Sequence, residues 1–495
     1  MPDRCATSAR ARRGRTAVFA LALFVLLTGC AQHARVICDP LEKASRREFD
    51  AAVASLEATK LAESDRDRFL YHAQRGHLLH LAGDFEASNE AFERAVAAGE
   101  ELEPTSVTAT IADYTLNEAV KAYPGEDYER AYLHYYMALN YLALDDQEAA
   151  LVECRRLDRV FRELDARYDD ERRFRDDGFI RYLSGLIYES TGRINDAFVD
   201  YKAAVRAYRS APGFSSLPDG LVSSLRATGA TLGLDAQVSE LLGENDDAAA
   251  DSADVAPSGQ NGRRAPTPAA HGSRPDSEIV VIIDAGWAPF KQERSVEVPI
   301  YRPLVPEGLR GEDWLAALVK VAYPEYVSVP LSTDAFTASA TPVDPDGGAR
   351  VARAEKVKDI DRLARETLER RLGALKLRST MRATAKQIAL MKQKADHAEG
   401  AENRSIGERI LRGILERTAT VLTAETEQAD TRSWVTLPRE VHLARIGVPP
   451  GVYAVELRAG GDSSLVDTVL VDPDRKVFRP ARVIGGPHPV RCERD

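Results

Sequence analysis

A chain of 495 residues is too long for one hydrophobic core, so we expect two or three domains. Its content of 44% apolar and 29% charged residues is typical of a soluble globular protein. The formal net charge is −11, and it becomes −15 without the five arginines and one aspartate that precede Cys30. Such an acidic chain argues against nucleic acid or anionic lipid as the main partner.

The first 29 residues have the three parts of a secretory signal. Five arginines come first, an unbroken apolar run follows over residues 17–27, and small residues precede Cys30. The apolar run is shorter than the roughly 20 residues that a membrane-spanning helix needs. We therefore predict a signal peptide over residues 1–29.

The end of this signal, formed by Leu27, Thr28, Gly29 and Cys30, resembles the lipobox of bacterial lipoproteins. In that family the peptide is cut before the cysteine, which then carries the lipid, so the resemblance implies lipidation at Cys30. Ala31 follows where an aspartate would imply retention at the inner membrane, so the resemblance implies anchoring in the outer membrane. Two or more acyl chains hold a protein stably at a bilayer. The alternative is an ordinary cleaved signal with a chance cysteine.

Residues 30–42 are interpreted as a short tether, and residues 43–243 as a series of helices. In the second segment apolar residues recur at i, i+3, i+4 and i+7, and Gly or Asp-Asp marks the turns. Three stretches within it share the same offsets between small and aromatic residues. Their defining residues are Gly76, Gly83, Phe85, Phe92 and Ala95; Ala138, Tyr141 and Ala150; and Gly185, Tyr188, Gly192, Ala197, Tyr201 and Ala204.

These stretches resemble the tetratricopeptide repeat. The resemblance implies antiparallel helix pairs, in which the small residues allow close approach and the aromatic residues fill the space between helices. The copies do not follow the usual period of about 34 residues, so extra segments must separate them. A last helix pair is expected over residues 218–242. We predict an N-terminal all-α helical solenoid.

Residues 244–277 are rich in Asp, Ala, Ser, Pro and Gly and show no apolar period, which predicts a disordered linker. Residues 278–475 are interpreted as a C-terminal α+β domain. Strands are expected within 278–345, helices within 356–424 and strands again within 435–472. Residues 314–321 are interpreted as a short helix. Gly373 is interpreted as a break in the long helix expected from residue 356 onward. Residues 476–495 are expected to be a tail.

The stretch from Ala429 to Pro438, followed by a Pro-Gly turn and a strand, resembles a motif of an uncharacterised family of bacterial tetratricopeptide-repeat-containing lipoproteins. This resemblance brings no known reaction. Two interpretations are open for Asp430, Arg432 and Trp434 within the motif. As Arg and Trp are common interface anchors, they could form a binding patch. Alternatively, Arg432 pairs with Asp430 or with backbone carbonyls, and Trp434 packs over the sheet.

No catalytic or cofactor motif stands out, and we predict no catalytic residue, metal or cofactor. His72, His77 and His80 are the one histidine cluster, but a single helix rarely completes a tetrahedral metal site. Cys38 and Cys492 could pair in an oxidising compartment. Cys154 stands where the repeat has an aromatic residue, which favours a buried free thiol.

These features predict a lipid-anchored scaffold on the periplasmic face of the outer membrane, without enzymatic activity. Its helical solenoid would offer a concave groove to an unknown envelope protein or peptide. Two alternatives remain open at this stage: an enzyme or enzyme activator acting on the cell wall, and an accessory protein of secretion or surface assembly.

Overall fold

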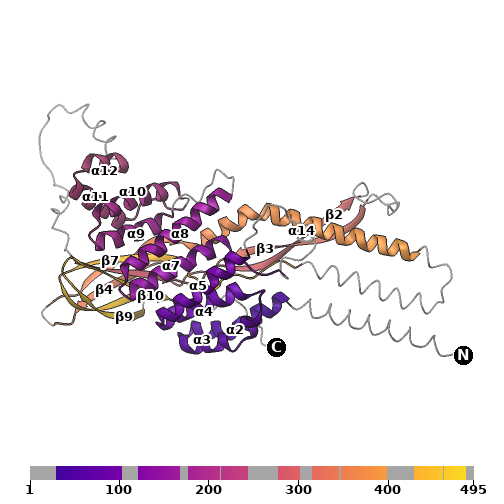
Figure 1. Cartoon of the computed structure of the whole chain (residues 1–495), viewed down its shortest axis with the longest axis horizontal. Helices are drawn as coiled ribbons and strands as arrows, with labels where there is room; N and C mark the ends of the chain where they lie inside the picture. Colours follow the sequence, from indigo (N-terminus) through magenta and orange to yellow (C-terminus); the bar gives the residue numbers. More distant parts are fainter. Residues whose placement is uncertain are drawn as a thin grey trace, which may run out of the picture.

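The computed structural model describes residues 29–102, 121–167, 177–211, 213–243, 277–301, 315–344, 347–398, 428–460 and 462–485. Two parts pack together in it (Figure 1). One is an array of helices from the N-terminal half, and the other is a body of β-sheet from the C-terminal half, from which a long arm extends.

The helical array consists of antiparallel pairs. The helices are α2 (Gly29–Ser45) with α3 (Phe49–Glu57), the short 3₁₀ helix η1 (Lys60–Glu63), α4 (Arg68–Ala82) with α5 (Phe85–Glu101), α7 (Asp127–Ala143) with α8 (Gln147–Arg167), α9 (Gly178–Ser190) with α10 (Ile194–Ser210), and α11 (Asp219–Leu232) with α12 (Asp235–Leu242).

Small residues set the distance between the helices of a pair. A Cβ atom added to Gly76 of α4 would lie 2.7 Å from the Phe92 ring of α5, and one added to Gly185 of α9 would lie 2.4 Å from the Tyr201 ring of α10. The turn after α4 places Gly83 at φ +87°, a conformation that suits glycine. The helical part therefore resembles a tetratricopeptide solenoid in its pairing and in its small-to-aromatic contacts.

Two four-stranded sheets form the C-terminal body. Sheet A has the order β10 (Lys476–Val483), β1 (Ser277–Ala285), β7 (Glu440–Val448) and β6 (Glu355–Asp359), in which β1 and β10 are parallel. Sheet C has the order β5 (Arg350–Arg353), β4 (Phe336–Pro342), β8 (Gly451–Ala459) and β9 (Asp462–Val471), and its strands are antiparallel.

Strand β1 is buried on both faces because it lies in the middle of three layers. Ile279, Val281 and Ile283 pack with Phe336, Val455 and other residues of sheet C. The alternate residues Val280 and Ile282 belong instead to the core of the helical array. Sheet A is thus sandwiched between the helices and sheet C, which explains the unbroken apolar run Ile279–Ile283 within β1.

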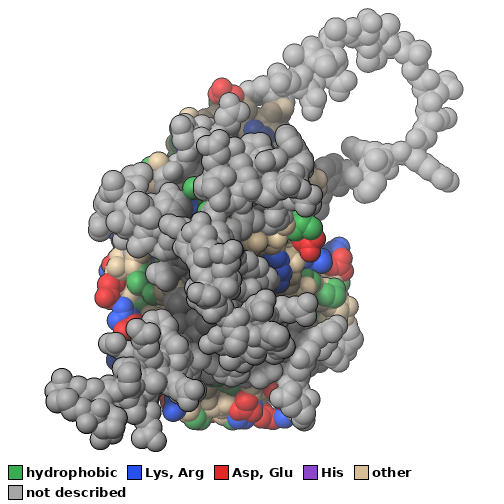
Figure 2. Space-filling view, turned by 90° about the vertical axis from the view of Figure 1, so that its right-hand side faces the viewer, with side chains coloured by type: hydrophobic (Ala, Val, Ile, Leu, Met, Phe, Trp, Pro, Cys, Tyr) green, Lys and Arg blue, Asp and Glu red, His purple; other side chains and the backbone are tan. Residues whose placement is uncertain are grey.

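The arm combines a β-hairpin with a long helix. Strands β2 (Phe290–Tyr301) and β3 (Leu315–Val327) pair along their length, and α14 (Ile360–Ala398) packs along β3. Figure 2 views the molecule from the side toward which the arm points. On the coloured part of that face, acidic and basic side chains are interspersed rather than gathered by sign.

Several sequence predictions differ from the structure. Within the predicted tether, α2 is helical and packs through Ile37, Leu41 and Ala44, whose spacing of four and three residues gives one apolar face. Residues 314–321 were expected to be helical, yet β3 begins at Leu315. Its Val319 and Val321 are buried while Leu318 is exposed, an alternation that suits pairing with β2.

The predicted C-terminal tail contains β10. Pro480 is tolerated there because β10 is the edge strand of sheet A. Lys356–Asp359 belongs to β6 rather than to a helix, and α14 runs past Gly373 without a break. A single exposed glycine costs a helix only about 1 kcal/mol, which packing on β3 outweighs. The expected helix over 405–423 and most of the predicted linker, residues 244–276, lie outside the described residues.

Cys38 is disulfide-bonded, whereas Cys154 is free and buried. Burial raises the pKa of the Cys154 thiol to about 12, so this sulfur stays protonated. Cys492 lies outside the described residues, and its pairing with Cys38 stays a prediction. Within the described ranges, no helix combines the length and the apolar composition required to cross a bilayer.

Candidate functional site

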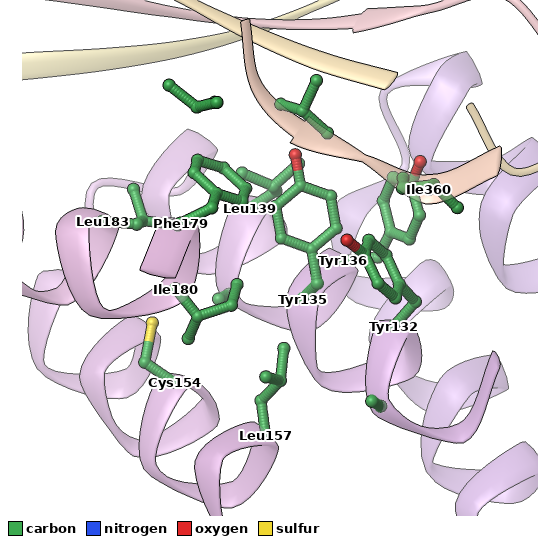
Figure 3. Packing of buried hydrophobic residues seen from close by; sticks show 14 of the residues in the cluster. Tyr132, Tyr135, Tyr136, Leu139, Cys154, Leu157, Phe179, Ile180, Leu183 and Ile360 are labelled. Carbon is green, nitrogen blue, oxygen red and sulfur yellow. The ribbon is translucent and has the colours of Figure 1, made fainter. Parts of the chain in front are cut away.

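The face of the array that includes α7 and α9 is covered by the chain's own sheet A. We call the contact between the helical array and the β body the seam. Figure 3 shows Tyr132, Tyr135 and Tyr136 of α7 projecting toward the strands, beside Phe179 of α9. Their neighbours in one continuous core include Val280, Val357 and Phe478 of sheet A. The groove that we expected to receive a partner is therefore already filled on this face, which corrects the prediction of an open groove there.

Arg432 anchors one end of the seam. All five of its guanidinium N–H groups are used: Nε and Nη2 donate to Asp430, Nη1 donates to Asp67 and to the Arg66 carbonyl, and Nη2 also donates to the Lys121 carbonyl. The donor–acceptor distances lie between 2.8 and 3.2 Å. Burial would lower the pKa of Arg432, but the Asp430 and Asp67 carboxylates outweigh it and raise that pKa.

Trp434 lies beside this arginine and is fully buried. Its indole N–H donates to Thr436 Oγ1 at 2.8 Å, and its backbone N–H donates to Glu129 of α7 at 2.7 Å. The side chain also contacts the rings of His77, Phe92 and Tyr136. Arg432 and Trp434 thus join the two halves of the chain, and they do not form an exposed binding patch.

Two glutamates at the start of α7 form a second charged centre. Glu126 pairs with Lys291 of β2 and with Arg371 of α14, at 2.7 Å from the latter. Burial would raise the pKa of Glu126, yet these two cations lower it to about 2. Glu129 accepts from the Tyr123 hydroxyl and from two backbone N–H groups, and burial raises its pKa to about 7. The pKa values of these two neighbouring carboxyls are therefore shifted in opposite directions.

A third centre surrounds Asp284, at the end of β1. The Tyr135 and Tyr136 hydroxyls donate to its two carboxylate oxygens at 3.0 and 2.6 Å, and burial raises its pKa. Arg482 of β10 lies nearby. Its Nη2 donates to the Thr436 carbonyl at 3.0 Å, while Nε and Nη1 are shielded from solvent and have no hydrogen-bond partner. Burial lowers the pKa of this guanidinium.

A pocket of about 380 Å³ opens against this centre, between the array and the edge of the two sheets. Asp284, His80 and Arg482 line it together with Arg47, while apolar walls come from Phe49, Leu81, Phe85, Leu457, Val466 and Pro480. His80 is hydrogen-bonded to Asn140 at 2.6 Å, and burial lowers its pKa to about 4, so this imidazole is neutral at pH 7.

Further ionic contacts continue the seam toward α9 and α11. Arg445 of β7 pairs with Glu278 at 2.7 Å and donates to Tyr182, Ser224 and the Gly220 carbonyl. Lys476 of β10 pairs with both Glu278 and Glu189. These contacts fix the array against the sheet along most of its length, so the two parts form one unit.

The array also carries a cleft of about 400 Å³ between α8, α9 and α10, away from sheet A. Arg181 lies in it and pairs with Asp158 at 2.8 Å and with Asp200 at 3.0 Å. Burial raises the pKa of Asp200 to about 6. Val199 at its edge is 58% exposed, although it is a large apolar residue. We call this the outer cleft.

The residues singled out in the sequence fall into distinct places. The repeat-defining residues lie within the helix pairs α4/α5, α7/α8 and α9/α10, and Tyr188 lines the outer cleft. His77 and His80 are buried in the seam with their ring centres 6.2 Å apart, whereas His72 lies in contact with the Tyr71 ring. Within the described ranges, no group of three or more potential ligands is placed to hold a metal. Side-chain placement of Cys30 is not described.

Sequence reasoning missed Arg482, Asp284 and Glu129. Arg482 lay in the presumed tail, and Asp284 ended a strand whose neighbours were unknown. Asp284 did carry a signal, since an acidic residue directly after a fully apolar strand usually lies at a sheet end where polar groups gather.

No family model matches the chain, and no curated protein matches it. Among solved structures, the chain resembles the MamA protein, with 16% identity over 44% of this chain and 94% of that one at a TM-score of 0.27. It also resembles the apo form of RapI, with 12% identity over 44% of this chain and 54% of that one at a TM-score of 0.31. A third similar structure is YrrB, described as a TPR protein with an unusual peptide-binding site, with 15% identity over 43% of this chain and 84% of that one at a TM-score of 0.26. Such low TM-scores support no functional inference.

The geometry defines the class of the protein. It is a two-part chain in which a tetratricopeptide-like helical array is held against sheet A of the β body through a buried polar seam, so that the array, sheet A and sheet C form three layers.

Proposed function

We propose that this chain is a lipid-anchored, non-enzymatic interaction scaffold on the periplasmic face of the bacterial outer membrane. The location rests on the predicted signal that ends at Cys30 and on Ala31 after it. The scaffold role rests on the helical array, since arrays of this kind present extended surfaces to other proteins.

The outer cleft is the observation that carries the proposal. Sheet A fills the face of the array that includes α7 and α9, so a partner must use another surface. The outer cleft offers an exposed apolar side chain, Val199, beside the charged groups of Arg155, Arg181 and Asp196. This combination suits a peptide segment that carries both an apolar anchor and charges.

The anchor would be attached rigidly. Helix α2 begins at Gly29, and its residues Ile37, Leu41 and Ala44 pack into a core with α3 and α4. Since a helix of 17 residues is about 25 Å long, the lipid on Cys30 would hold the array close to the bilayer surface.

The partner test uses point variants, because removing the whole array would strip sheet A of its cover. Val199→Glu places a charge at the edge of the outer cleft, and Val152→Glu places the same charge at another exposed position of the array, outside the residues that line that cleft. Each variant is crosslinked in intact envelopes, and the captured proteins are identified by mass spectrometry. We expect Val199→Glu to lose a protein that Val152→Glu retains. The same set of proteins for both variants would refute binding at this cleft.

The anchor test compares the chain with its Cys30→Ala variant after labelling with radioactive palmitate. We expect label in the outer-membrane fraction for the unchanged chain alone. Equal labelling of the two, or no labelling of either, would refute lipidation at Cys30.

A further inference from the structure

The pocket at Asp284 holds an unusual cation. Arg482 has two guanidinium nitrogens that are shielded from solvent and lack a hydrogen-bond partner. Among the described residues no carboxylate lies within 4 Å of it to form an ion pair. The two oxygens of Asp284, the nearby carboxylate, instead accept hydrogen bonds from the Tyr135 and Tyr136 hydroxyls. Shielded donors without a partner destabilise the folded chain, so the site is incomplete without a further acceptor.

The environment of Arg482 favours an anion. Its guanidinium carbon lies 5.4 Å from the centre of the Trp287 ring, a contact that does not neutralise its charge. Arg47, an exposed residue with φ +63°, adds a second cation at the pocket. His80 is neutral and competes for no anion. Two cations at one pocket, with one carboxylate already bonded to tyrosines, leave room for one further negative charge.

The apolar walls specify what must be attached to that charge. Phe49, Phe85 and Leu457 lie in the same pocket as Arg482, and the volume of about 380 Å³ is at the small end of the range for ligand pockets. A phosphate ion alone would leave these walls uncovered. A carboxylate that carries one apolar side chain would satisfy both parts of the pocket, and the C-terminal residue of a protein has this chemistry.

We propose that this pocket binds the C-terminal carboxylate and the last, apolar side chain of a partner protein, with Arg482 as its anion-binding group. The proposal deepens the scaffold function and rests on it for the identity of the ligand as a protein. It concerns a different surface from the outer cleft, so the two can fail separately.

The experiment uses two small probes of identical shape. N-acetyl-leucine carries a free carboxylate, whereas N-acetyl-leucinamide is neutral. Binding to the purified chain without residues 1–29 is followed by the fluorescence of Trp287, which lies against Arg482; the Trp287→Phe variant identifies its contribution. We expect the acid to bind at least tenfold more tightly than the amide, since charge-assisted hydrogen bonds are the stronger ones.

Variants then assign the preference to the pocket. Arg482→Gln should abolish the preference for the acid, whereas Arg479→Gln should keep it. Arg479 lies on the same strand but pairs with Asp467 at 2.7 Å and does not line the pocket. Ser464→Tyr fills the pocket from β9 and should also abolish binding, which provides a second test if Arg482→Gln does not fold.

Each other outcome overturns the proposal. Equal binding of acid and amide would remove the role of the charge, and an unchanged preference in Arg482→Gln would place the anion elsewhere. Inorganic phosphate that binds as tightly as N-acetyl-leucine would make this a general anion site. If neither probe binds while Val199→Glu still loses a crosslinked protein, the pocket proposal fails and the scaffold proposal stands.

Discussion

The contact of Arg432 with the helical array allows a quantitative prediction. Arg432→Gln removes the cation that bridges Asp430 and Asp67, whose side chains are 18% and 2% exposed. Breaking a buried ion pair costs about 3–5 kcal/mol because the remaining charge is left without compensation. Arg66 still contacts Asp67 at 3.2 Å, so we expect a loss near the lower end, about 3 kcal/mol.

Arg432→Lys gives an intermediate test. An ammonium group has three donors, whereas the five hydrogen bonds of Arg432 reach two carboxylates and two backbone carbonyls. At least two bonds must therefore be lost, and the expected loss is about 2 kcal/mol. The order of stability is then Arg432, lysine and glutamine.

The assay is equilibrium unfolding in urea, followed by tryptophan fluorescence, because buried Trp434 lies two residues from Arg432. The control is Arg94→Gln, at an exposed residue whose nearest carboxylate, Glu90, is 3.8 Å away; we expect a change within about 0.5 kcal/mol. If Arg432→Gln destabilises the chain no more than Arg94→Gln does, the argument that this residue holds the seam together is refuted.

Two further predictions concern packing and pH. Gly185→Ala would place a methyl group 2.4 Å from the Tyr201 ring and should destabilise the chain by about 1–3 kcal/mol, whereas Gly373→Ala in the exposed part of α14 meets no atom within 4 Å and should stabilise it by up to about 1 kcal/mol. Thermal unfolding by circular dichroism should show shifts of opposite sign, and shifts of the same sign would contradict this account of close approach. Glu129 has a folded pKa of about 7 against 4.5 in the unfolded chain, so the folded state binds more protons between these values. Its contribution to stability is complete below pH 4.5 and is lost as the pH rises through 7, on the order of 3 kcal/mol. Glu129→Gln should therefore flatten the melting temperature between pH 5 and 8 relative to the unchanged chain, and parallel curves would show that Glu129 does not titrate there.

The helix pairs could be predicted because their signals are local. Gly76 contacts Phe92 and Gly185 contacts Tyr201 at a separation of 16 residues, so one repeat contains both partners. The buried strand β1 was equally clear, since its run Ile279–Ile283 is apolar on both faces. At this level the helical N-terminal part and the sheet-containing C-terminal part are confirmed.

The seam could not be predicted, because its contacts join residues that are far apart in sequence. Arg432 and Asp67 are separated by 365 positions, and Arg445 and Tyr182 by 263. The motif around Arg432 was visible, but nothing in it distinguished a buried bridge from an exposed patch. Strand β10 was missed because Pro480 and its arginines suggest a tail, and only the edge position beside β1 makes such a sequence compatible with a sheet.

The parallel pairing of β1 with β10 constrains how the chain can acquire its structure. Glu278 of β1 is aligned with Lys476 of β10 in that ladder. The edge strand of sheet A therefore comes some 200 residues after the strand with which it pairs. A polypeptide that emerges N-terminus first from a ribosome exposes the tyrosine-rich face of α7 well before the strands that cover it are synthesised. The apolar face of these helices stays exposed to solvent until the chain has been synthesised as far as residue 483. Such a delay exposes the nascent molecule to aggregation and creates a need for a holding chaperone.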